Sequence, residues 1–138
     1  MNQGKRPGGL TALAVLNFIF SGWGLLGLLG MITMFVLFGK LAIQAMGWPI
    51  LIGLLVVSAV SSILLLLSGI GYIKQKKFLG RALGNTYAIL AIISGVVSAL
   101  IMKPEIGGGF NIGGIIGLIY PLLTLILLNT TFKEDLAN

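Results

Sequence analysis

Four long apolar runs without a single charged side chain dominate this sequence. They extend over about residues 10–38, 49–73, 82–102 and 110–128. Each run reaches or nearly reaches the ~20 residues that a helix needs to cross a hydrocarbon core of ~30 Å. Because an unpaired backbone group is costly in lipid, each run is expected to be a helix. The sequence therefore predicts an all-α, polytopic membrane protein, with one four-helix transmembrane bundle over residues 1–138.

The balance of apolar and charged residues supports the same interpretation. Hydrophobic residues make up 57% of the chain and charged residues 9%, whereas soluble proteins carry about 25% charged residues. A soluble fold of this size would not cover its surface with so few charges. Because the connections between the runs are short, consecutive helices are expected to be antiparallel neighbours.

The distribution of Lys and Arg predicts the orientation. Seven of these residues fall on one side of the predicted bundle, namely Lys5, Arg6, Lys74, Lys76, Lys77, Arg81 and Lys133. The other side carries Lys40 and Lys103. By the positive-inside rule, both termini are expected to be cytoplasmic, in a multi-pass protein of the cell membrane. This bias accounts for the net charge of +6 without a nucleic-acid partner.

A stripe of small residues follows one face of the third run. Its members, spaced three or four residues apart, are Gly80, Gly84, Ala88, Ala91, Gly95 and Ser98. The fourth run has a shorter stripe of Gly109, Gly113 and Gly117. In lipid, small residues let helix backbones approach closely and so promote helix association. Two interpretations stay open: the stripes pack within one chain, or they form an interface with a second copy or a larger membrane complex.

Small and polar residues also share a face in the first two runs. The first run offers Asn17, Ser21 and Gly24, and the second Ser58, Ser62 and Gly69. Asn17 is expected to form a hydrogen bond to another helix. Pro121 lies inside the fourth run and is expected to kink it.

Four cations lie close together between the second and third runs, at Lys74, Lys76, Lys77 and Arg81. They are the residues that the positive-inside rule requires there. They are also candidates for contact with anionic lipid headgroups or with an acidic partner.

Residues for catalysis or metal binding are scarce. The chain has no Cys and no His, which removes thiolate and imidazole chemistry. The three carboxylates, Glu105, Glu134 and Asp135, are predicted to lie outside the hydrocarbon. We therefore predict no catalytic site, metal site or cofactor, and we do not expect an enzyme.

Three segments, residues 6–17, 71–84 and 119–129, resemble a loose group of small bacterial four-helix membrane proteins of unknown function. That group shares a basic-Pro-Gly opening, a basic turn with Gly-Arg, and a Tyr-Pro…Leu-Asn ending. The resemblance implies a bacterial inner membrane and the same topology. It implies no active site.

The features above predict a non-catalytic membrane subunit. It is expected to assemble with itself or with a larger complex through the small-residue faces, among membrane lipids. The alternative is a channel or carrier for a small neutral or lipidic solute, which the glycine-rich fourth run and the polar faces favour. The absence of charged residues within the predicted spans argues against ion coupling but allows a neutral solute.

Overall fold

The computed structural model describes residues 7–101 and 112–136, and in this part the fold is entirely helical. Four α-helices follow in order: α1 (Gly8–Met46), α2 (Trp48–Ile73), α3 (Leu83–Ile101) and α4 (Ile112–Asn129). A short π-helix, η1 (Lys77–Ala82), precedes α3. Three helical segments are long and apolar enough to cross a membrane: Gly8–Met46, Trp48–Ile73 and Lys77–Leu100. The fourth contributes a shorter apolar segment, Gly117–Asn129.

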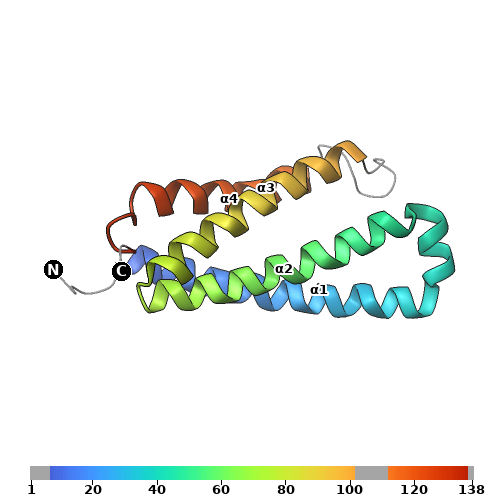
Figure 1. Ribbon diagram of the computed structural model, residues 1–138, viewed down its shortest axis with the longest axis horizontal. Coiled ribbons are helices and arrows are strands. Elements are labelled where there is room, and N and C mark those ends of the chain that lie inside the picture. Colours follow the sequence, from blue (N-terminus) through green and yellow to red (C-terminus); the bar gives the residue numbers. More distant parts are fainter. Residues whose placement is uncertain (1–6, 102–111, 137–138) are drawn as a thin grey trace.

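The helices form two antiparallel hairpins (Figure 1). α1 packs along α2, and α3 packs along α4, whereas α2 and α3 contact each other over a shorter stretch. The hairpins meet at the end of the molecule where α1 begins and α4 ends, and they diverge toward the other end (Figure 1). We call the first the closed end and the second the open end.

The first helix is longer than the sequence pattern predicts. Residues 39–48 are expected to be a connection, but α1 continues to Met46. Its axis breaks at Phe38, where φ is −127° and ψ is 24°, and beyond this residue it turns toward α2 (Figure 1). The chain then reverses at Gly47, whose φ of +82° favours glycine. The predicted end of the first helix near residue 38 was therefore wrong, because no Pro lies in residues 39–46 and the helix continues after a single distorted turn.

The connection between α2 and α3 is tight. Gln75 has a φ of 50°, and η1 begins two residues later, at Lys77. Gly71 and Gly80 make this turn possible. A Cβ atom added to Gly71 would overlap the backbone of Leu79 and Gly80, and would lie 2.6 Å from the Gly80 Cα. The two backbones therefore pack directly against each other, which only glycine permits.

A compact hydrophobic core lies at the closed end. It joins the start of α1, the end of α2 and the end of α4, through Leu10, Leu13, Ala14, Tyr72, Leu128, Phe132 and Leu136. Elsewhere most large apolar side chains are exposed, including Trp23, Val36 and Leu100. An outer surface of this kind suits contact with lipid rather than with water.

Candidate functional site: a groove between the two hairpins

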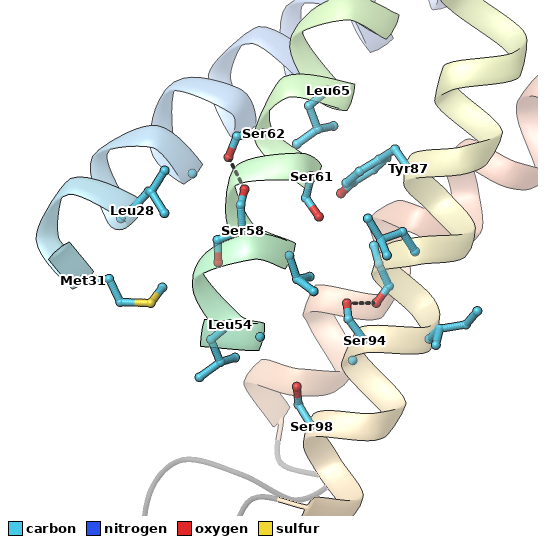
Figure 2. Close-up of a pocket in the computed structure, with 18 of the residues that line it drawn as sticks. Leu28, Met31, Leu54, Ser58, Ser61, Ser62, Leu65, Tyr87, Ser94 and Ser98 are labelled. Atoms are coloured by element: carbon cyan, nitrogen blue, oxygen red, sulfur yellow. Dashed lines mark hydrogen bonds between the residues drawn. The ribbon is translucent and has the colours of Figure 1, made fainter. Parts of the chain in front are cut away.

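Because the hairpins diverge, a groove of about 840 Å³ lies between α1, α2 and α3. Its walls are mostly apolar, and they include Phe20 and Met31 from α1, Leu54 and Leu65 from α2, and Leu90 from α3. Figure 2 shows α2 and α3 facing each other across it. The volume lies within the range of about 300–1,000 Å³ that is usual for small-molecule sites.

Hydroxyl groups are distributed along the two facing walls. α2 contributes Ser58, Ser61 and Ser62, and α3 contributes Tyr87, Ser94 and Ser98 (Figure 2). Two of these serines bond to their own helix: Ser62 donates to the Ser58 carbonyl at 2.9 Å and Ser94 to the Ala91 carbonyl at 3.1 Å. Among residues 7–101 and 112–136, those that line the groove include no Lys, Arg, Asp or Glu. The groove therefore offers neutral hydrogen-bonding groups on an apolar background.

Aromatic rings lie at the inner end of the groove. Phe20 and Tyr87 are lining residues, and both contact Tyr120 of α4, with ring centroids 4.7 and 6.4 Å apart. The Tyr120 hydroxyl donates a hydrogen bond to the Asn17 side chain. The rings thus connect the groove to the polar contacts that join α1 to the rest of the bundle.

The polar faces of the first two helices pack against each other. Asn17 donates to the Ser68 hydroxyl at 2.7 Å, which confirms the predicted bond between helices. Ser21 donates to the Ser62 carbonyl at 2.9 Å. A Cβ atom on Gly69 would lie 3.3 Å from the Asn17 Cβ. These residues stabilise the α1–α2 hairpin.

The small-residue stripe of the third run divides into two parts. Gly80, Gly84 and Ala88 are buried within the chain. A Cβ atom on Gly84 would lie 2.6 Å from Leu128 Cδ1 and would also overlap the Tyr72 hydroxyl. The next three members, Ala91, Gly95 and Ser98, line the groove instead. Gly95 also packs against α4, because its Cβ would lie 2.8 Å from Leu118 Cδ2.

The stripe of the fourth run is only partly described. Gly109 lies outside the described residues, and Gly113 lies in α4, where its surroundings are likewise outside the described part. Gly117 is exposed, and a Cβ atom there would meet nothing within 4 Å among the described residues. α4 is one continuous helix through the buried Pro121.

The four basic residues lie together at the closed end. Lys74 follows the last residue of α2, Lys76 precedes η1, and Lys77 begins it, with all three side chains exposed. Arg81 is half-buried and donates to the Asn129 side chain at 3.4 Å. They are therefore separated along the chain from the groove-lining residues.

Sequence reasoning missed Tyr87 and Ser61. The signal for Tyr87 was its position three residues after Gly84, beside the small-residue stripe, and the signal for Ser61 was its place next to Ser62.

Comparisons of this chain with protein-family models, with curated proteins and with solved structures give no significant match. The resemblance to small bacterial membrane proteins therefore stays an expectation, and the groove is the basis for a functional proposal.

Proposed function

We propose that this protein is a non-catalytic membrane protein that binds a small neutral or lipidic molecule in the groove between its hairpins, as a carrier would. The observation that supports this most is the groove itself, with its volume of about 840 Å³ and its uncharged lining. An apolar cavity with a few polar groups is the usual form of a small-molecule site. The described residues of its lining supply no carboxylate for acid–base catalysis.

The closed end makes a carrier a better candidate than an open channel. The core around Leu10, Tyr72 and Leu128 joins three helices at that end, and these three side chains are fully buried. A molecule would therefore enter from the open end or from the side, where the hairpins diverge. Passage through the closed end would require the hairpins to separate.

Ala91 offers a direct test. It lies on the α3 wall of the groove, so Ala91→Leu places three additional carbon atoms in the groove without entering the closed-end core. We expect wild-type protein, extracted in a mild detergent, to retain a small molecule that native mass spectrometry detects. Ala91→Leu is expected to lose most of it. Ala45→Leu, which changes an exposed residue of α1 outside the groove, is the control and is expected to retain it. Equal retention by all three proteins would contradict the proposal.

Association through a small-residue face is the second candidate. Gly117 supports it, since this glycine is exposed on α4 with open space around it. A second copy or another membrane subunit would pack closely there. Gly117→Leu is then expected to break a complex whose mass is measured in mild detergent. An unchanged mass would exclude an assembly that depends on this face.

We further propose that the protein lies in a bacterial inner membrane with both termini in the cytoplasm. The exposed Lys74, Lys76 and Lys77 at the closed end support this orientation, and they would face anionic headgroups at about 1 kcal/mol each. Fusing alkaline phosphatase, which is active only outside the cytoplasm, to the C-terminus is expected to give an inactive reporter. An active fusion would reverse the orientation.

A further inference from the structure

We infer that the ligand of the groove is a neutral lipid whose carbonyl or hydroxyl group is held by the Tyr87 hydroxyl, with its chain lying along α2 and α3 toward Ser98. This inference rests on the proposed function and adds the ligand class and the anchoring residue.

Tyr87 presents its hydroxyl to the groove. Only 8% of this residue is exposed, and its hydroxyl points across the groove toward α2, in the direction of Ser61 (Figure 2). Within the described ranges, no residue forms a hydrogen bond with this hydroxyl. In the described part of the chain, the fully buried hydroxyls without a partner are those of Tyr72 and Thr124. The Tyr87 hydroxyl instead reaches the open space of the groove, where it is available to donate to a bound molecule. A hydrogen-bonding group in the groove would satisfy it.

The chemistry of the lining excludes a charged headgroup at this position. Tyr87 and the serines are neutral, and none of the lining residues in the described part of the chain is Lys or Arg. An anionic phosphate placed beside Tyr87 would have no counter-charge and would be costly in an apolar environment. A phenolic hydroxyl donates well to an ester carbonyl or an alcohol oxygen. The groove therefore suits a lipid such as a diacylglycerol or a long-chain alcohol.

The length of the groove suits an extended molecule. From Tyr87 to Ser98, α3 rises about 17 Å at 1.5 Å per residue. The hydroxyls of Ser61 and Ser98 offer further contacts along this length.

The experiment uses the full-length protein in phosphatidylcholine nanodiscs. A diacylglycerol with a photoreactive diazirine in one acyl chain is the probe, and a phosphatidylglycerol with the same chain is the charged comparison. Wild-type protein is expected to cross-link saturably to the diacylglycerol probe at groove residues such as Trp23 and Leu90. The phosphatidylglycerol probe is expected to label these residues at least fivefold less.

Three variants separate the inference from the proposed function. Tyr87→Phe keeps the ring and is expected to weaken diacylglycerol labelling about five- to tenfold. Thr86→Val is the control, because Thr86 is exposed, lies outside the groove and bonds to the Ala82 carbonyl. It is expected to label like wild type. Ala91→Leu is expected to abolish labelling in the groove. Thermal unfolding of each variant verifies that it is folded.

The outcomes are distinct. If Ala91→Leu abolishes labelling but Tyr87→Phe behaves like wild type, the groove is a binding site and the inferred anchor is overturned. Equal or stronger labelling of the groove by phosphatidylglycerol would overturn the neutral ligand class. Labelling that is scattered over the outer helix faces and unaffected by Ala91→Leu would overturn the proposed function together with the inference.

Discussion

At the closed end of the molecule, small residues lie beneath the side chains of other helices, whereas toward the open end similar residues line a groove. α3 shows this difference along its own length. Gly84 packs under Leu128 and Tyr72, but Ala91, two turns later, faces the groove. The same face of α3 is therefore tightly packed near the closed end and forms an accessible groove wall nearer the open end.

The difference arises from the geometry of the hairpins. Backbone contact between Gly71 and Gly80 holds α2 and η1 together at the closed end, and the helix axes diverge from there (Figure 1). Packing in lipid depends on close van der Waals contact, so it is strong where the helices touch and absent where they separate. A bundle of this form can keep a stable base while it leaves space for a ligand.

The largest difference in stability is expected between leucine substitutions at the packed and at the groove-lining position of α3. Gly84→Leu forces a large side chain against Leu128 and Tyr72, and we expect it to lower the free energy of unfolding by about 3 kcal/mol. Ala91→Leu extends into the groove and is expected to change it by less than about 1 kcal/mol. Unfolding in mixed micelles with increasing SDS measures both values. Similar losses of unfolding free energy for the two variants would contradict the proposed difference in packing between the closed end and the groove.

A second test concerns the contact between α2 and η1. Gly71→Ala places a Cβ atom against the backbone of Leu79 and Gly80, which cannot rotate away as a side chain could. We expect a loss of about 2 kcal/mol. Gly53→Ala is the matched control in the same helix, because nothing among the described residues lies within 4 Å of its Cβ. It is expected to be neutral or slightly stabilising. The midpoint of thermal unfolding in detergent compares them, and equal midpoints would show that the close approach is dispensable.

A third test concerns the hydrogen bond between Asn17 and Ser68, which joins α1 to α2. Asn17→Leu removes this buried bond of 2.7 Å and the one from Tyr120, with an expected loss of about 1 kcal/mol. A double-mutant cycle with Ser68→Ala isolates the direct contact and is expected to give a coupling of about 0.5 kcal/mol or more. Strict additivity of the two changes would indicate that the contact contributes no stability.

The smallest effect distinguishes two serines. Ser21 is buried and donates to the Ser62 carbonyl at 2.9 Å, so Ser21→Ala is expected to cost about 0.5–1 kcal/mol. Ser98 lines the groove, and within the described part of the chain its hydroxyl forms no hydrogen bond. Ser98→Ala is therefore expected to lie within about 0.5 kcal/mol of wild type. The same unfolding assay ranks the two, and the reverse order would place the stabilising contacts at the open end.

Much of the helical architecture could be read from local sequence. Uncharged apolar runs predicted four helices, because the lack of charge and the length of each run are local properties. Asn17 could be predicted to bond to another helix, since a polar group in an apolar run needs a partner. The break at Phe38 could not be predicted in the same way, because neither Gly nor Pro occupies that position. The distortion lies where α1 turns toward α2.

The spacing of the small residues in the sequence is enough to place them on one face of α3, because helical periodicity brings them together. The packing of the helices then buries Gly80, Gly84 and Ala88 within the chain and leaves Ala91 and Ser98 on the wall of a groove. Periodicity defines a face of a helix but says nothing about the distance to the neighbouring helix. That distance depends on where the two hairpins touch, and it is the divergence from the Gly71–Gly80 contact that leaves the Tyr87 hydroxyl facing an open space.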